Sequence, residues 1–376
     1  MFKSQICNLP IVILLLFFYG CEIDTTSQNS APEIVSLSAE PSSIEPGGTS
    51  IITCFASDTE GDSLYYSWST TCGEIQGAGS IVTYTAPLSE EICSISCTVS
   101  DPDGGEATQS ISIVTVSQSF DWIIVPAGPY TFGIYGEMLD DIDYDFEIMK
   151  YEVTNIKYVH YLTEALGSGK ITVTPDSVLG YYEGDELYGA GNKLYLNMVE
   201  PSSIQWDGSS FTIVSGYEDH PVVSVTWFGA NAFANHYGLG LPTENEWEKA
   251  ARGNTGYDYP WGDDIDGSRA NYVNSGDPYE QGSWAEQPQT TPVGFYDGSE
   301  HDGFQTVDSP SMYGVYDMIG NAYEWCSTWY SLSYYYRDFR GGSWSSVTNN
   351  LPAWLQYGLY PHNGYIIIGF RCVRYN

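Results

Sequence analysis

The sequence has little positive charge. Lys and Arg account for 12 of its 376 residues, against 48 Asp and Glu, so the formal net charge is −36. Proteins that bind nucleic acid neutralise phosphates with Lys and Arg, and proteins that adhere electrostatically to anionic lipid need basic patches. The composition therefore excludes nucleic acid as a partner and disfavours electrostatic membrane adhesion. It permits calcium binding.

Several motifs of catalysis are also missing. The sequence contains no Gly-x-Ser-x-Gly, no phosphate-binding Gly-rich loop and no His-Glu-x-x-His. Its five histidines, at 160, 220, 236, 301 and 362, are scattered. The eight cysteines form no Cys-x-x-Cys pair, which argues against a structural zinc site. The apolar content of 42% is nevertheless enough for real cores.

The apolar run from Leu9 to Tyr19 is too short to span a bilayer and has the length of a signal-peptide core. It follows Lys3 and ends in Gly20-Cys21, which resembles a bacterial lipobox. We expect residues 1–21 to be a lipoprotein signal peptide with Cys21 acylated, and residues 22–31 to be a flexible tether. An ordinary signal peptide cleaved elsewhere is the alternative.

Residues 32–118 have short β-rich runs separated by turns, which predicts an antiparallel sandwich. The order Cys54, Trp68, Cys97 resembles immunoglobulin-like domains, and similar modules serve as spacers in bacterial surface proteins. The predicted strands cover residues 33–38, 50–56, 64–69, 81–85, 92–100 and 108–116.

Four cysteines in this domain allow three disulfide pairings. Cys93 and Cys97 lie on one face of one strand and cannot bridge each other. We favour Cys54–Cys97 with Cys72–Cys93, which fits an exported compartment. Acidic turns in the same domain hold either calcium or only water; these acids are Asp58, Glu60, Asp62, Asp101 and Asp103.

The stretch from Gly314 to Tyr330 carries the clearest chemistry. Asp317 and Glu324 lie seven residues apart, on either side of a Gly320-Asn321 turn. Gly and Asn both tolerate positive φ. Two carboxylates and the carbonyls of such a turn can hold a hard cation, or they can be a core turn with two surface acids.

Six motifs stand in the order found in one family: VPAG (125–128), FEIMKYEVTNIKYVHYL (146–162), HPVVSVTWFGANAFANHYGLGLPTENEWEKAARG (220–253), GNAYEW (320–325), RGGSW (340–344) and GFRC (369–372). The chain from about Phe120 onward therefore resembles the formylglycine-generating enzyme (sulfatase-modifying factor) family. The resemblance implies a C-type-lectin-like α+β domain over residues 119–376, behind the immunoglobulin-like β-sandwich.

The resemblance also implies bound calcium. The matching ligands are the side chains of Asp317 and Glu324 with the carbonyls of Gly320 and Ala322. A second site is expected at Asn271 and Tyr272, with Glu286 as a weak candidate for the partner acid.

Helical spacing predicts helices over residues 152–165, 225–237 and 243–253. Thr243 and Glu246 form a capping-box pattern, and Gly253 is a predicted C-cap. The cap and the helix dipole account for two of the acids Glu244, Glu246 and Glu248. Residues 172–216 show no recognisable chemistry.

The enzymes of this family bind copper(I) through two cysteines and oxidise a sulfatase cysteine. The matching positions here hold Ser346 and Leu351. Soft thiolates are the ligands that copper(I) requires, so we expect no copper and no oxidase activity. Cys326 and Cys372 are expected to form a structural disulfide; a catalytic pair is the alternative.

Residues 344–369 are rich in Ser, Asn, Gly, Tyr and Trp and almost uncharged, a composition typical of binding loops. Their frame also resembles retroelement-diversified variable proteins of this fold, or an ordinary family C-terminus. The residues that we expect to contact a ligand are Trp344, Ser345, Ser346, Trp354, Tyr357, Tyr360 and Tyr365.

Taken together, these features favour a lipid-anchored protein of the bacterial cell envelope, at the outer membrane or cell surface, that binds a protein or glycan. Two alternatives remain open. One is a divergent oxidoreductase acting on a sulfatase cysteine, and the other is a structural envelope component.

Overall fold

The computed structural model describes residues 29–117, 119–134, 138–199, 201–280 and 287–375. The signal-peptide run, Cys21 and Glu286 lie outside these residues. Within them, no helix combines the length and the apolar character needed to cross a bilayer.

The N-terminal part is a sandwich of two four-stranded sheets, as the alternating strands predict. One sheet has the order β1-β3-β6-β5 and the other β2-β8-β7-β4. Alternate residues of β7 are buried, so one face of that strand lies against the opposite sheet. The strands are β1 (Glu33–Glu40), β2 (Ser43–Ile44), β3 (Thr49–Ser57), β4 (Tyr65–Thr70), β5 (Glu74–Gly77), β6 (Ile81–Thr85), β7 (Glu91–Ser100) and β8 (Glu106–Thr115).

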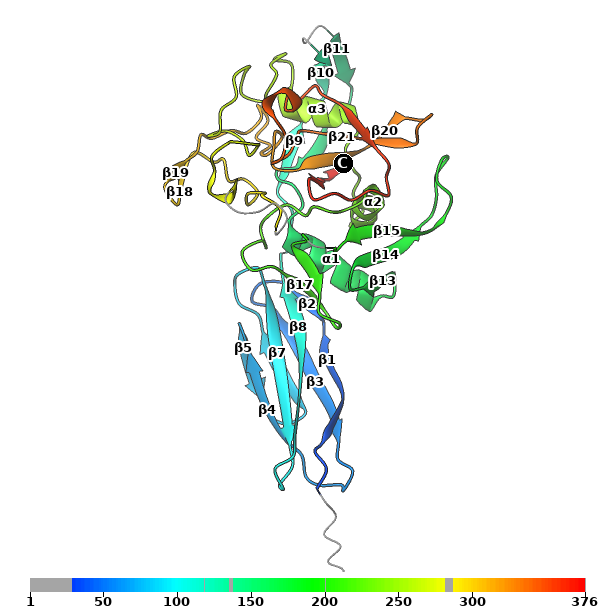
Figure 1. Cartoon of the computed structure of the whole chain (residues 1–376), viewed down its shortest axis with the longest axis vertical. Coiled ribbons are helices and arrows are strands. Elements are labelled where there is room, and N and C mark those ends of the chain that lie inside the picture. Colours follow the sequence, from blue (N-terminus) through cyan, green and yellow to red (C-terminus); the bar gives the residue numbers. More distant parts are fainter. Residues whose placement is uncertain (1–28, 118, 135–137, 200, 281–286, 376) are drawn as a thin grey trace, which may run out of the picture.

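The C-terminal part is a mixed α/β domain built from short sheets and three helices (Figure 1). Its four-stranded sheet has the order β22-β21-β20-β23, and a three-stranded sheet has the order β24-β12-β9. The helices are α1 (Asn155–Gly167), α2 (Trp227–His236) and α3 (Glu244–Arg252), with 3-10 turns at Pro278–Glu280 and Thr348–Asn350.

The first strands of this domain are β9 (Trp122–Val125), β10 (Gly128–Phe132), β11 (Met138–Ile142), β12 (Phe146–Met149), β13 (Ile171–Thr174), β14 (Ser177–Tyr182), β15 (Gly191–Asn197), β16 (Ile204–Trp206) and β17 (Phe211–Ile213). The last are β18 (Glu300–His301), β19 (Phe304–Gln305), β20 (Tyr323–Ser331), β21 (Tyr336–Arg340), β22 (Tyr357–Leu359), β23 (Ile368–Gly369) and β24 (Val373–Arg374).

Strand β20 lies between two hydrophobic clusters. Tyr323 and Trp325 pack into the cluster around α1 and α2, whereas Cys326 packs into the cluster around α3. Successive side chains of a strand point to opposite faces, so β20 joins the two halves of the core. Core packing on both faces of β20 therefore fixes the start of this strand, which directly follows the Gly320-Asn321 turn.

The two domains pack against each other where β8 ends. Val114 and Val116 belong to the same core cluster as α1 and α2. Lys157 of α1 donates to the carbonyls of Ser117 and Ser119 at 3.1 and 3.2 Å. The sandwich extends from this junction toward the opposite pole, where β1 begins (Figure 1).

The sequence predicted six of the eight sandwich strands and missed β2 and β5, which have two and four residues. The helix predictions are confirmed. Thr243 accepts from the Glu246 backbone, and the Glu246 carboxylate accepts from the Thr243 backbone at 2.7 Å, which is the expected capping box. Gly253 ends the helix with a φ of 56°.

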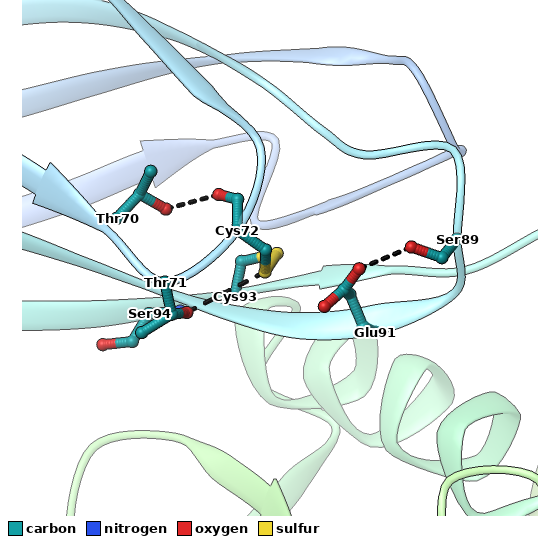
Figure 2. The surroundings of a disulfide bond; sticks show 7 residues. All are labelled: Thr70, Thr71, Cys72, Ser89, Glu91, Cys93 and Ser94. Atoms are coloured by element: carbon teal, nitrogen blue, oxygen red, sulfur yellow. Dashed lines mark hydrogen bonds between the residues drawn. A yellow bond between two sulfur atoms is a disulfide. The ribbon is translucent and has the colours of Figure 1, made fainter.

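The cysteine predictions are only partly right. Cys72 and Cys93 form the expected disulfide, which ties the β4–β5 connection to β7 (Figure 2). Glu91 lies beside these sulfurs, but two sulfurs bonded to each other are not available as metal ligands. This group is therefore a covalent link between strands.

The predicted Cys54–Cys97 and Cys326–Cys372 disulfides are wrong, because all four cysteines are buried free thiols. Cys54 and Cys97 fill space between the two sheets as small apolar side chains beside Val99. Cys326 and Cys372 belong to different core clusters, which separates them across β20.

Candidate functional site

The turn before β20 adopts the predicted left-handed conformation. Gly320 has a φ of 81° and Asn321 a φ of 56°. A Cβ atom on Gly320 would lie 2.2 Å from the carbonyl oxygen of Asn271, so only glycine fits there. The Asn321 backbone N–H donates to the same Asn271 carbonyl at 2.9 Å. This hydrogen bond links the predicted calcium site at Asp317 and Glu324 to the one at Asn271 and Tyr272.

Glu324, the predicted calcium ligand on β20, is buried and hydrogen-bonded by residues of two other segments. Arg371 donates to its two carboxylate oxygens from Nε and Nη2, both at 2.7 Å. Trp247 of α3 donates to Oε2 at 2.8 Å. The GFRC and GNAYEW motifs are therefore joined by a buried bidentate ion pair between Arg371 and Glu324.

Two further carboxylates lie close to this pair. Glu152 accepts from Asn321 Nδ2 at 3.0 Å and from the Ala322 backbone at 3.2 Å, and Asp317 accepts from the Gly294 backbone at 2.6 Å. Burial raises the pKa of Glu152, and the neighbouring acids raise it further. Burial likewise raises the pKa of Asp317 to about 6.

The positions that would carry copper ligands are closed off. Ser346 Oγ donates to the hydroxyl of Tyr323 at 3.1 Å and accepts from the Ser343 backbone at 3.0 Å. Leu351 is fully buried in the core cluster around α3. The free thiols Cys326 and Cys372 are also fully buried, and burial raises the pKa of both. These residues do not fit copper(I).

The family model described as "Sulfatase-modifying factor enzyme 1-like domain" matches residues 110–376. The chain belongs to this family. Residues 29–114 match the model of a bacterial Ig domain, in agreement with the sandwich.

Over 240 residues, the chain is 34% identical to a protein named serine/threonine-protein kinase Pkn1 from Chlamydia trachomatis, covering 59% of this chain and 32% of that protein. It is 32% identical over 183 residues to the formylglycine-generating enzyme of Streptomyces coelicolor, covering 43% of this chain and 54% of the enzyme. It is 34% identical over 161 residues to inactive C-alpha-formylglycine-generating enzyme 2 of Bos taurus, covering 41% and 50%. The alignments thus span about a third to a half of these relatives.

The buried acids around Asp317 offer oxygen ligands of the kind needed by the calcium that this sulfatase-modifying-factor family implies, but no three of these acids bring ligand atoms within 4.8 Å of one another in the described residues. Three buried carboxylates, Glu152, Asp317 and Glu324, face one guanidinium, Arg371. The arrangement leaves negative charge without a partner, which a divalent cation would neutralise. Within the described residues, Glu324 Oε1 accepts only from Arg371 and keeps a second lone pair, whereas Oε2 accepts from both Arg371 and Trp247.

At the second region, Asn271 is buried and its Oδ1 has no hydrogen-bond partner among the described residues. Its Nδ2 donates to the Gln289 carbonyl at 2.8 Å, which fixes the amide with Oδ1 as the open acceptor. An unused buried oxygen fits a cation ligand. The Tyr272 carbonyl already accepts from the Ser275 backbone at 2.9 Å.

A buried ion network around Glu248 was missed by the sequence analysis. Glu248 accepts from Arg252 at 2.9 Å, from Arg340 at 3.0 Å and from the Gly133 backbone at 2.8 Å. Arg340 also donates to Asp338 at 3.1 Å. Burial raises the pKa of Asp338 to about 7, despite the neighbouring Arg340. The network joins α3 to the RGGSW strand.

The predicted ligand-contacting residues divide by exposure. Trp344 and Ser346 are buried, and Trp344 Nε1 donates to the Ile366 carbonyl at 3.0 Å, so their prediction as surface contacts is wrong. Trp354 is half-buried and donates to Asp258 at 2.7 Å. Half-buried Tyr357 stacks on Phe339 with ring centroids 5.6 Å apart. Ser345, Tyr360 and Tyr365 are exposed.

The β20–β21 hairpin extends this surface with tyrosines that the sequence analysis did not single out. Tyr336 meets Tyr360 at 4.6 Å between ring centroids, Tyr360 stacks on His362 at 5.2 Å, and Tyr334 lies 5.9 Å from Tyr336. Tyr330 covers Gly358, where a Cβ atom would lie 2.1 Å from its ring. We call this set, Tyr330, Tyr334, Tyr336, Tyr360 and His362, the aromatic face.

Proposed function

We propose that this protein is an envelope lipoprotein whose sulfatase-modifying-factor domain has lost the copper chemistry and binds a ligand through the aromatic face. The observation that carries the proposal is the pair Ser346 and Leu351, which offers no soft ligand at the copper positions. Cys326 and Cys372 do not replace the missing pair, because they lie in separate cores, and Cys54 and Cys97 belong to the sandwich and not to this domain.

The aromatic face has the chemistry of a protein-binding surface. Tyr330, Tyr334 and Tyr360 are 48%, 65% and 39% exposed, although each carries a large ring. Tyrosines combine apolar area with a polar tip and lose little conformational entropy on binding. None of the five cavities described for the chain is lined by these residues, so the face suits a flat protein surface better than a glycan.

The sandwich supports a role as a spacer. Asn29, the first described residue, donates to Asp101 at 3.1 Å at the pole opposite the C-terminal domain (Figure 1). A lipid on Cys21 would tether that pole to a membrane. The aromatic face would then point away from the lipid surface, toward partners outside the envelope.

Calcium belongs to the same proposal. One ion would bind to Asp317, Glu324 and the carbonyls of Gly320 and Ala322, and a second would bind to Asn271 and the Tyr272 carbonyl. The bound calcium would supply positive charge and stiffen the turn. The role is structural, because a rigid scaffold holds the contact side chains in place.

Diversification of the surface is a further part of the proposal. Within residues 344–369, the segment whose frame resembles diversified proteins, Ser345, Val347, Tyr360 and Tyr365 are exposed. A near-copy of the coding segment for residues 344–371 beside a reverse transcriptase gene would support it. An identical segment in many independent isolates would contradict it.

The binding proposal is tested by placing a photo-crosslinking amino acid at Tyr360 in the whole protein on cells. Leu88, which is 87% exposed in the sandwich, is the control position. We expect one predominant crosslinked protein from position 360 and not from position 88. The double variant Tyr336→Ser/Tyr360→Ser should weaken its binding at least about 100-fold, and Tyr65→Ser should not. Equal binding by all variants would contradict the proposal.

A further inference from the structure

A large cavity of the described chain lies away from the aromatic face. It has a volume of about 680 Å³, which is in the range of ligand pockets. Its walls come from the C-terminal end of α1 and the start of β13, from β14 and β15, and from α2. It takes no lining residue from 344–365, the segment in which the sequence predicted ligand contacts.

The floor of this cavity is aromatic and held in place. Tyr182 meets the ring of Phe228 at 4.9 Å and donates to Asp185 at 2.7 Å. Tyr195 donates to the Tyr181 carbonyl at 2.6 Å, and its ring lies over Gly180, where a Cβ atom would be 2.1 Å away. These hydrogen bonds fix both rings before any ligand arrives, which lowers the entropy lost on binding.

Two asparagine side chains line the cavity without hydrogen bonds to the rest of the described chain. Asn231 and Asn235 lie one turn apart on α2, so they share a face, and both line the cavity. Neither side chain makes a hydrogen bond within the described part of the chain; Asn231 is half-buried, where amides usually find partners, and Asn235 is exposed to solvent. Each amide offers donors and an acceptor at one point, which suits vicinal hydroxyl groups.

The cavity lining has no net charge that would attract an ionic ligand. Apart from His236, the charged side chains on its lining are the basic Lys170 and the acidic Glu183, whose charges cancel. The whole chain carries −36, so an acidic ligand would be repelled over a long range.

We infer that this cavity between α2 and the β14–β15 hairpin binds a neutral saccharide, with tyrosine rings against the apolar face of a sugar and Asn231 and Asn235 on its hydroxyls. Flat rings with polar edges and free amides match such a ligand, which presents C–H groups on one face and hydroxyls at its rim. This binding goes beyond the proposed function, because it uses other elements and needs no protein partner.

The test is calorimetric titration of the full-length protein with maltotriose, N,N′-diacetylchitobiose and lactose, with 3′-sialyllactose as the acidic comparison. We expect at least one neutral saccharide to bind with a Kd of about 1 mM or tighter. Asn231→Ala/Asn235→Ala should weaken that binding at least about tenfold, the loss expected for about one hydrogen bond.

Asn192→Ala is the matched control, since Asn192 is an exposed asparagine of β15 outside the cavity, and it should bind like the wild type. Tyr336→Ser/Tyr360→Ser should also leave saccharide binding unchanged, which separates this site from the aromatic face. Thermal melting of each variant confirms its fold. Absence of binding to all three neutral saccharides at about 10 mM, preference for sialyllactose, or undiminished binding by the double asparagine variant would overturn the inference.

Discussion

Arg371 and Glu324 are 47 residues apart in the sequence and form a two-pronged ion pair with both nitrogen–oxygen distances at 2.7 Å. Neither side chain is exposed beyond 1%. Arg371 also donates to the carbonyls of Met149, Lys150 and Tyr316, at 2.9 to 3.2 Å. The pair thereby ties the end of the chain to β12, to the turn and to β20.

Arg371→Met should lower the free energy of unfolding by about 3–5 kcal/mol, because it leaves Glu324 charged and buried without its partner. Arg374→Met is the matched control. Arg374 pairs with Glu147 at 2.7 Å, but its side chain is 42% exposed and that of Glu147 11%, so water screens this pair and its loss should cost less than the loss of Arg371. Denaturant unfolding measures both. Equal losses in the two variants would argue against this role for the buried pair.

Asp338 should make stability depend on pH. An unfolded Asp loses its proton near its ordinary value of 3.8, whereas burial raises the pKa of folded Asp338 to about 7. Between about pH 4 and 7 the folded state therefore binds more protons, and this group's contribution to the free energy of unfolding falls as pH rises. From pH 5 to pH 7 the wild type should lose about 2 kcal/mol relative to Asp338→Asn. Parallel pH profiles of the two proteins would contradict the prediction.

The Cys72–Cys93 disulfide spans 21 residues, and closing such a loop stabilises by about 3 kcal/mol in the chain-entropy model. Reducing agent should lower the free energy of unfolding of the wild type by that amount and leave Cys72→Ser/Cys93→Ser unchanged. Cys54→Ala should keep the full response. A persisting response in the double serine variant would show that Cys54 and Cys97 are bonded after all.

Calcium should stabilise the protein through Asp317. Adding calcium at about 100 times its Kd to chelator-treated protein should contribute about 2.7 kcal/mol. The melting temperature would then rise by about 5 °C or more. Asp317→Ala should remove most of this rise, because it removes a ligand oxygen together with its charge, whereas Asp143→Ala should keep it. A full response in Asp317→Ala would place any bound calcium elsewhere.

Local features were predictable from the sequence. The capping box joins Thr243 to Glu246, three residues away, and the turn at Gly320 and Asn321 depends on the φ preferences of two residues. The sandwich followed from alternation within each strand. Such signals are complete within a short stretch of chain, so no knowledge of the tertiary fold was needed.

Features that depend on distant contacts were not predictable in the same way. Glu248 looked like a residue of a capped helix, but its partner Arg340 is 92 residues away. Trp344 looked like a binding residue from composition, yet its indole reaches Ile366 and is buried. The cavity between α2 and β14–β15 could not be predicted, because β14–β15 has no recognisable motif and only the fold brings Asn231, Tyr182 and Tyr195 to one lining.

The most direct test of the central claim is an anaerobic copper(I) titration of the purified protein, followed by oxygen and a cysteine-containing sulfatase peptide, with mass spectrometry of the peptide. Ser346 and Leu351 offer no soft ligand, so we predict no stoichiometric copper and an unmodified cysteine. Uptake of one copper per chain with conversion of the cysteine to an aldehyde would contradict the account.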